Sequence, residues 1–123
     1  MNSAAMITVL FLFTATSALA AGGSEHRPLH GGVVVEVKDI DYELVAKSDA
    51  LQLYLRDHGK TVDLVGASAK LTLLTGSDKQ EVELKPAGGR LEAKGSFKIA
   101  AGTKVIVVVS VAGKTSTARF VLK

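Results

Sequence analysis

The sequence predicts an all-β protein, an antiparallel two-sheet β-sandwich of about eight strands. Three observations predict this fold class. Apolar and polar side chains alternate with a period of two over most of residues 31–123, as in strands that bury one face. Turn-forming residues recur at intervals of roughly 8–12 residues, which is the strand spacing of sandwiches and barrels. Because each alternating strand has one polar face, we favour the sandwich over the alternative, a small β-barrel.

The first strands are marked by their apolar alternation. Residues 33–37 are almost all Val and predict the first strand, since β-branched side chains favour extended backbone. At residues 42–47 aromatic and aliphatic side chains alternate with charged ones, which predicts a second strand. Three Leu residues alternate with polar or aromatic residues across 51–56 and predict a third strand with one buried face. The Asp-His-Gly-Lys sequence at 57–60 then predicts a turn, because Gly accepts a positive φ.

The second half continues as strands separated by turns. The Pro-Ala-Gly-Gly sequence at 86–89 interrupts the pattern, because Pro lacks a backbone donor and Gly permits a reversal. Gly95 predicts a bulge or bend, after which the alternation resumes. The run at 105–109 is apolar on both faces, as expected of a central strand. The strands expected here are residues 69–73, 81–85, 91–93, 97–99, 105–109 and 115–122.

The beginning of the chain predicts export. Residues 7–13 form an apolar run and Ala18-Leu19-Ala20 has the small-x-small pattern of a signal-peptidase site. This run is shorter than the roughly 20 residues that span a bilayer, so we expect cleavage and no membrane insertion afterwards. The predicted organisation is a signal peptide at 1–20, a flexible leader at 21–30 and one β-sandwich domain at 31–123. The expected location is therefore outside the cytoplasm.

Composition and motifs narrow the function. The chain has 15 Lys and Arg against 12 Asp and Glu, and the two signs are interspersed, which is typical of a soluble surface and argues against nucleic-acid binding. It contains no Cys, so disulfides, thiol nucleophiles and thiolate metal sites are excluded. No G-x-S-x-G motif and no Gly-rich loop before a helix is present. We therefore expect no enzyme and no organic cofactor.

Histidines are the candidate functional residues. His26 and His30 lie together in the leader, where two imidazoles near a chain end could hold one divalent transition metal such as Zn, Cu, Ni or Co. Glu43 faces outward on the second strand and could approach His30 if the first two strands pair. His58, in the turn at 57–60, is a further possible ligand. The alternative is that none of these residues has a function. His26 and His30 would then lie in a solvated leader, Glu43 would be a solvated strand residue and His58 a polar turn residue.

Three stretches are similar as a set to a known group of proteins. They are His-Gly-Gly at 30–32, Tyr-Glu-Leu-Val at 42–45, and Leu-Tyr-Leu-Arg-Asp followed by Gly-Lys within 53–60. The set resembles small exported bacterial proteins found with heavy-metal efflux systems, and a module of the periplasmic adaptor subunits of those pumps. The last stretch is also similar to immunoglobulin-like exported modules. The resemblance implies a periplasmic β-sandwich with a metal-related role, with His30 and Glu43 nearest the motif.

Two hypotheses of different classes follow. The first is a periplasmic accessory protein that binds a divalent transition metal, with His30 and His26 as ligands and Glu43 or His58 as possible further ligands. Such a protein would serve heavy-metal resistance by passing the ion to an efflux adaptor protein. The second is a non-catalytic interaction module without metal, which docks a partner through Val34, Val45 or an unpaired edge strand. Histidines packed near Glu43 would favour the first.

Overall fold

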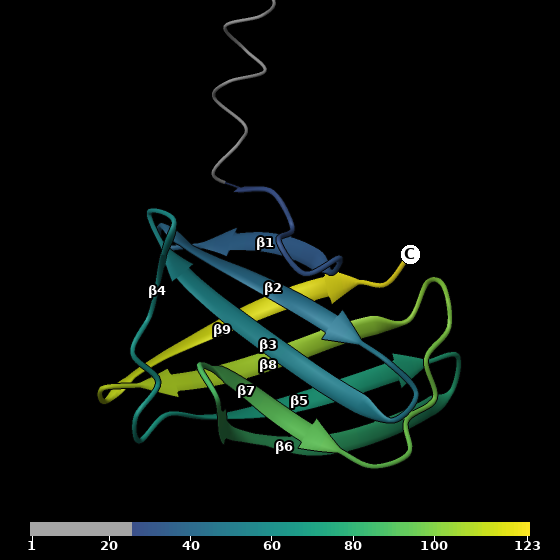
Figure 1. The fold of residues 1–123 in the computed structure, drawn as a ribbon. Coiled ribbons are helices and arrows are strands. Elements are labelled where there is room, and N and C mark those ends of the chain that lie inside the picture. The colour runs from purple at the N-terminus through teal and green to yellow at the C-terminus, as the bar shows by residue number, and fades with distance from the viewer. Residues whose placement is uncertain (1–25) are drawn as a thin grey trace, which may run out of the picture.

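A computed structural model describes residues 26–123, which form nine β-strands and no helix (Figure 1). The predicted signal peptide and the first residues of the predicted leader lie outside the described residues. Within the described part, no helix is long and apolar enough to cross a membrane. The strands are β1 (Val33–Val37), β2 (Ile40–Ala46), β3 (Ala50–Asp57), β4 (Lys60–Thr61), β5 (Ser68–Thr75), β6 (Asp78–Ala87), β7 (Arg90–Lys94), β8 (Lys104–Val111) and β9 (Lys114–Val121).

Hydrogen bonds join these strands into a single antiparallel sheet that curls into a nearly closed barrel. The order is β1-β2-β3-β7-β6-β5-β8-β9, with β4 paired to the end of β3. β1 and β9 lie close together at the two ends of this path, but no ladder joins them within residues 26–123. Figure 1 shows β2 and β3 crossing in front of β8 and β9, which form the opposite wall. The all-β class is confirmed, and the predicted two-sheet, immunoglobulin-like sandwich is wrong.

Strand β6 explains why the sheet is continuous. Residues 78–84 of this strand pair with β5, and residues 85–87 pair with β7. A strand that changes partner along its length carries the hydrogen-bond ladder from one wall to the other. Its alternation of polar and apolar residues is the same as in a sandwich strand, so the sequence pattern did not distinguish the two architectures.

The interior of the barrel holds the aliphatic side chains that the alternation assigned to the core. Leu51, Leu53 and Leu91 on one wall are fully buried, as are Leu71 and Val107 on the other. Such close-packed burial of large apolar side chains is the main stabilising contribution in a chain that has no disulfide. The fold is thus held by a single core that the inward-facing positions of both walls share.

Two local expectations fail. Residues 97–99 form no strand; instead the Phe97 amide donates to the Ser48 carbonyl at 2.8 Å, and the Phe97 ring packs into the core. β8 does lie between two strands, as expected, but only one of its faces is buried. Val107 is fully buried, whereas Val108 is 40 % exposed, because nothing in the described chain covers the outside of this wall.

Two tight hairpin turns fix how the strand ends meet. Lys38–Asp39 join β1 to β2, Ala112–Gly113 join β8 to β9, and all four residues have a positive φ. Two-residue turns of this kind match the right-handed twist of paired strands. The first turn places Glu36 directly opposite Asp41, on the outer face of the barrel.

Candidate functional site

Residues 26–32, which we call the N-terminal strap, lie against the outer face of β1, β2 and β3. Hydrogen bonds connect the strap to side chains of β2 and β3. Asp41 and Glu43 point away from the core, yet they are only 4 % and 0 % exposed, because the strap covers them. The strand register places two rows of side chains on this face: Glu36, Asp41 and Arg56 in one, and Val34, Glu43 and Tyr54 in the next.

Glu43 is the point to which the strap is attached. Its Oε1 accepts a hydrogen bond from the Leu29 amide at 3.0 Å, and its Oε2 accepts from the amides of His30 at 2.7 Å and Gly32 at 2.9 Å. The Nδ1 atom of His30 lies 3.0 Å from Oε1, and Arg56 donates to the same oxygen from Nη1 at 3.0 Å. These five donors satisfy a carboxylate that has no access to water. The solvated alternative for Glu43 is therefore wrong.

The same contacts determine the charge of Glu43. Burial raises the pKa of the Glu43 carboxyl, because the charged form loses its hydration. The hydrogen bonds from the Gly32 amide, the His30 ring and amide, and the Arg56 guanidinium act in the opposite direction. Together they outweigh the burial and lower the pKa of Glu43 from 4.5 to about 2. The carboxylate is charged at neutral pH, and Arg56, itself only 5 % exposed, supplies the compensating charge.

Arg56 and Tyr54 hold two further points of the strap. The Nη2 atom of Arg56 donates to the Arg27 carbonyl at 2.7 Å, so a single guanidinium bridges the Glu43 carboxylate and the strap backbone. The His30 ring stacks on Tyr54 with the ring centres 3.6 Å apart and the planes 6° from parallel. A charged carboxylate beside Nδ1 favours the proton on that nitrogen, which leaves Nε2 as the basic atom of a neutral His30 imidazole.

The two glycines after His30 let the strap turn onto the sheet. Gly31 has φ +77°, in the left-handed region that glycine adopts without strain. At Gly32 the backbone passes so close to β2 that a Cβ atom would lie 2.3 Å from the Leu44 carbonyl oxygen. Only glycine fits this approach, and it brings the Gly32 amide within reach of Glu43.

His26 lies at the start of the strap beside two carboxylates. Its Nδ1 is 2.8 Å from Oδ1 of Asp41, and Glu36 stands opposite Asp41 on the neighbouring strand. One ligand atom from each of His26, Glu36 and Asp41 lies within 4.8 Å of the other two. Among residues 26–123, this is the one group of three or more His and acidic residues whose ligand atoms lie this close together. His26 and Glu36 are exposed and Asp41 is buried, so the group opens to solvent on one side.

The structure separates the four predicted site residues into three places. It brings His30 and Glu43 into direct contact, and it places His26 on the neighbouring row with Asp41. His58 lies in the exposed turn between β3 and β4, where its Nδ1 is 2.6 Å from Oδ1 of its neighbour Asp57. His58 is therefore not part of the His26 group. Whether any of the four residues binds metal stays a prediction.

Glu36, Asp41 and Arg56 are the residues that sequence reasoning missed. A signal for the first two was present, because a two-residue turn at 38–39 forces positions 36 and 41 into register on the same face. For Arg56 the sequence indicated only that the side chain lies at an outward position on a strand, which is a weaker indication of a role in the site. Its role depends on the strap lying over β3, which no local pattern indicates.

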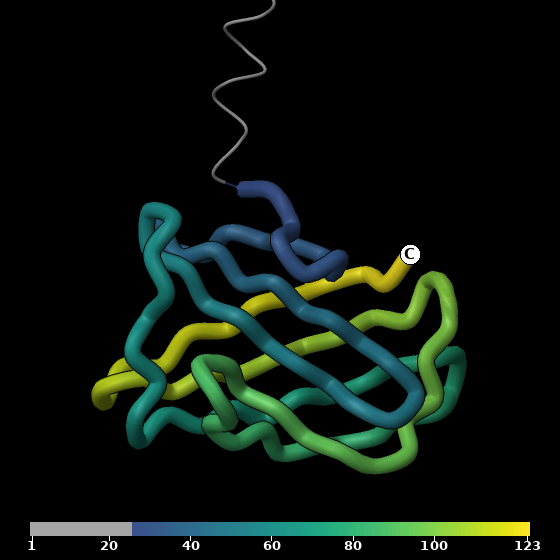
Figure 2. Tube along the Cα trace, viewed as in Figure 1, coloured from purple at the N-terminus to yellow at the C-terminus, as the bar shows by residue number. Residues whose placement is uncertain are grey.

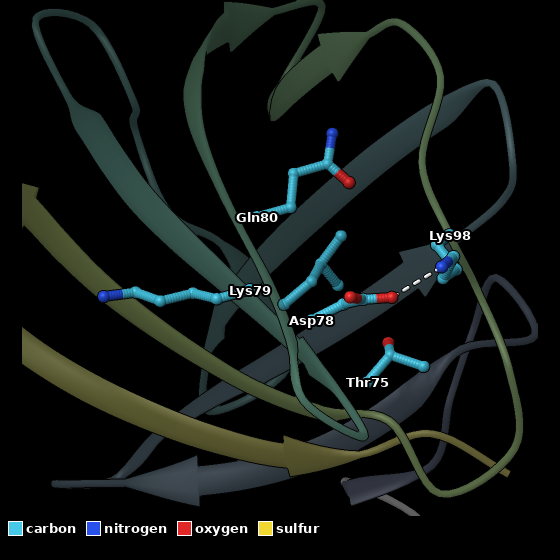
Figure 3. Close-up of a pocket in the computed structure, with 6 residues that line it drawn as sticks. Thr75, Asp78, Lys79, Gln80 and Lys98 are labelled. Atoms are coloured by element: carbon cyan, nitrogen blue, oxygen red, sulfur yellow. Dashed lines mark hydrogen bonds and ion pairs between the residues drawn. The ribbon is translucent and has the colours of Figure 1, made fainter.

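Other hollows of the surface are less suited to chemistry. Figure 3 shows one lined by Thr75, Asp78, Gln80 and Lys98, in which the Lys98 ammonium donates to the Asp78 carboxylate at 2.6 Å. This pair lowers the pKa of Asp78 and raises that of Lys98, mainly through their mutual hydrogen bond. Both side chains are largely exposed and neutralise each other, which is typical of an ordinary surface ion pair.

Comparisons with known proteins add no relative to this description. No family model, no curated protein and no solved structure matches the chain. The function is therefore argued from the geometry of the strap and from the residues beneath it.

Proposed function

We propose that the protein is a non-catalytic accessory protein that binds one divalent transition metal ion through His26, Glu36 and Asp41. The observation that carries the proposal is the convergence of one imidazole nitrogen and two carboxylate oxygens within 4.8 Å on an open face. Imidazole and carboxylate ligands together suit Zn²⁺, Cu²⁺, Ni²⁺ and Co²⁺, whereas Mg²⁺ and Ca²⁺ prefer sites made of oxygen alone.

The distances within the group suit this role. Zn–N and Zn–O bonds of about 2.1 Å put neighbouring ligand atoms roughly 3.0–3.4 Å apart. The His26 Nδ1 to Asp41 Oδ1 distance is 2.8 Å, so a small widening would admit an ion in place of the present hydrogen bond. Three protein ligands leave at least one position for water, which predicts an exchangeable ion and no closed structural site. An exchangeable ion is what a protein that passes metal to a partner requires.

The strap contacts assign different parts to the other candidate residues. The Glu43 carboxylate already accepts five hydrogen bonds, and a metal ion would have to displace several of them. We therefore give Glu43 and His30 the task of holding the strap, which in turn holds His26 over Asp41. His58 is left outside the site because its ring pairs with Asp57 in another turn.

The location and the partner that we propose are supported by the sequence alone. The apolar run and small-x-small pattern favour export to the periplasm, and the resemblance to proteins found with heavy-metal efflux systems favours an efflux adaptor as the recipient. The alternative, a metal-free interaction module, would use the edges of β1 and β9, which lie close together but share no ladder within residues 26–123. Val45 offers that alternative little, because it is 8 % exposed.

The test is a titration of the protein with Zn²⁺ and then Cu²⁺, followed by amide NMR and by calorimetry. We expect saturable changes at His26, Glu36 and Asp41 with one ion bound, and tighter binding of Cu²⁺ than of Zn²⁺. The substitution His26→Ala should weaken binding at least tenfold. His58→Ala is the matched control, because it removes an imidazole from the same protein and should leave the titration unchanged.

Two results would contradict the proposal. One is binding that survives His26→Ala unchanged, which would move the site elsewhere. The other is a weak response spread equally over all three His residues, which would indicate adventitious binding to exposed imidazoles. With no binding at micromolar metal, the edges of β1 and β9 would be the surfaces to test for a protein partner.

A further inference from the structure

The barrel has a hollow at the end where the β1–β2 and β8–β9 hairpin turns lie. The hollow has a volume of about 410 Å³ and is separate from the strap and the His26 group. In Figures 1 and 2 the chain after β4 runs along this end of the molecule and passes between the two walls. The larger apolar and aromatic residues of its wall are Ile40, Tyr42, Leu55, Val62, Val109 and Val111.

The wall of this hollow continues the core. Tyr42, Leu55 and Val109 are inward-facing residues of three different strands and are at most 3 % exposed. Val62 and Val111 stand nearer the opening, are half-buried and pack against the same core cluster. The hollow is therefore an opening into the apolar interior. Ligand sites of small barrels lie in such mouths, and volumes of about 300–1,000 Å³ are typical of them.

Charge at the opening is of a single sign. Lys38 from the first hairpin turn and Lys114 from the start of β9 both line the hollow, and no Asp or Glu is among the residues that line it. Two polar residues, Tyr42 and Ser116, are also among those that line the hollow. Tyr42 is only 3 % exposed, and its phenol is a hydrogen-bond donor in the wall that a ligand oxygen can use.

We propose that this hollow binds a small anionic amphiphile, a straight-chain fatty acid in its free form. The alkyl chain occupies the space between Leu55, Val109 and Val111, and the carboxylate lies at the mouth between Lys38 and Lys114. An apolar wall with two ammonium groups at its opening is complementary to one hydrocarbon chain with one negative head. A neutral lipid would leave the ammonium groups unused, and a polar anion would leave the wall without a contact.

The test measures binding of six-, eight- and ten-carbon fatty acids to the full protein by calorimetry and amide NMR. We expect one site, shifts centred on Ile40, Val62 and Val111, and an affinity that rises about fourfold per methylene until the chain fills the hollow. The alcohol of the same chain length should bind at least tenfold more weakly. Because the metal group lies on the outer face, binding should not change with Zn²⁺ present or with His26→Ala.

Charge reversal at the mouth separates the proposal from general hydrophobic binding. Lys38→Glu combined with Lys114→Glu should weaken fatty-acid binding at least tenfold and leave the fold intact, because both side chains are exposed. The matched control is Lys47→Glu with Lys104→Glu, which changes the net charge equally at the other end of the strands and should have no effect.

Three outcomes would overturn the proposal: no saturable binding, equal binding of acid and alcohol, or equal loss in both charge-reversed variants. Preferential binding to anionic phospholipid vesicles over the free acid would overturn it as well.

Discussion

Acid should destabilise this protein in large part through Glu43. The pKa of Glu43 is about 2 in the folded chain, against 4.5 for the free side chain. A carboxyl whose pKa is lowered by folding stabilises the folded state fully above its unfolded pKa. That contribution falls as the pH drops below about 4.5 and is lost once the pH has passed through about 2. The free energy of unfolding should therefore decrease steeply between these two values.

The size of the effect follows from the difference between the two pKa values. One unit corresponds to 1.36 kcal/mol, so lowering the pKa from 4.5 to about 2 contributes roughly 3 kcal/mol at neutral pH. Solvent screens these interactions only weakly, because the Glu43 side chain is 0 % exposed. This is a large fraction of the roughly 5–15 kcal/mol by which small domains are stable.

The variant Glu43→Gln isolates this contribution. An amide has the same shape but only one acceptor oxygen, so several of the five donors lose their partner and the Arg56 charge is left uncompensated. At pH 7 the variant should be less stable than the native protein by about 3 kcal/mol or more, and the gap should narrow as the pH approaches 2.5. Glu83→Gln is the matched control, because Glu83 is an exposed strand residue of β6.

The assay is urea unfolding followed by far-UV circular dichroism at a series of pH values from 7 to 2.5, since the chain contains no Trp for fluorescence. Equal slopes of stability against pH for the native protein and Glu43→Gln would refute the reasoning. An equal loss in Glu83→Gln would refute it too, because it would trace the acid sensitivity to carboxylates in general.

Four further substitutions test the strap and the turns. Gly32→Ala should lower the free energy of unfolding by several kcal/mol, because the new Cβ atom would lie 2.3 Å from the Leu44 carbonyl oxygen. Gly31→Ala should lower it by about 1 kcal/mol, because position 31 has open space for a side chain but a positive φ. Urea unfolding of both variants measures the difference. Arg56→Ala should lower the free energy of unfolding by about 3–5 kcal/mol, because it leaves the buried Glu43 charge unpaired. A smaller loss would mean that water enters and compensates the Glu43 charge. Ala112→Asn should stabilise by about 0.5–1 kcal/mol and raise Tm by several degrees in calorimetry, because Asn tolerates the φ of 52° that Ala112 adopts.

Local structure was largely predictable from the sequence because alternation reports directly on which face of a strand is buried. The inward positions of β3, Leu51, Leu53 and Leu55, follow from their period of two and are buried as expected. The arrangement of the strands did not follow, since β6 uses the same alternation to pair first with β5 and then with β7. Whether a sheet closes on itself depends on these long-range pairings, which a local sequence pattern does not indicate.

The candidate site shows a similar limit. The approach of Glu43 to His30 was predictable from the pairing of β1 with β2, because it needs only neighbouring strands and a short turn. The burial of Glu43 was not, because an outward position on a strand ordinarily means solvent. The segment that covers Glu43 is short, polar and contains Pro, so it has no periodicity from which a position on the sheet could be read.

The burial of a charge beneath the strap has a structural explanation that also bears on the metal group. The strap amides of Leu29, His30 and Gly32 donate to the Glu43 carboxylate and to no neighbouring strand. An apolar residue at position 43 would therefore leave these three amides without a hydrogen-bond acceptor. A carboxylate accepts from several directions at once and so replaces the missing strand. Replacing a buried ion pair by apolar residues is often neutral for stability, so we ascribe to Glu43 and Arg56 the role of fixing the path of residues 26–32. Since the same path brings His26 to Asp41, the metal affinity that we propose for the outer face should fall when Glu43 is replaced, even if the Glu43 carboxylate does not contact the ion.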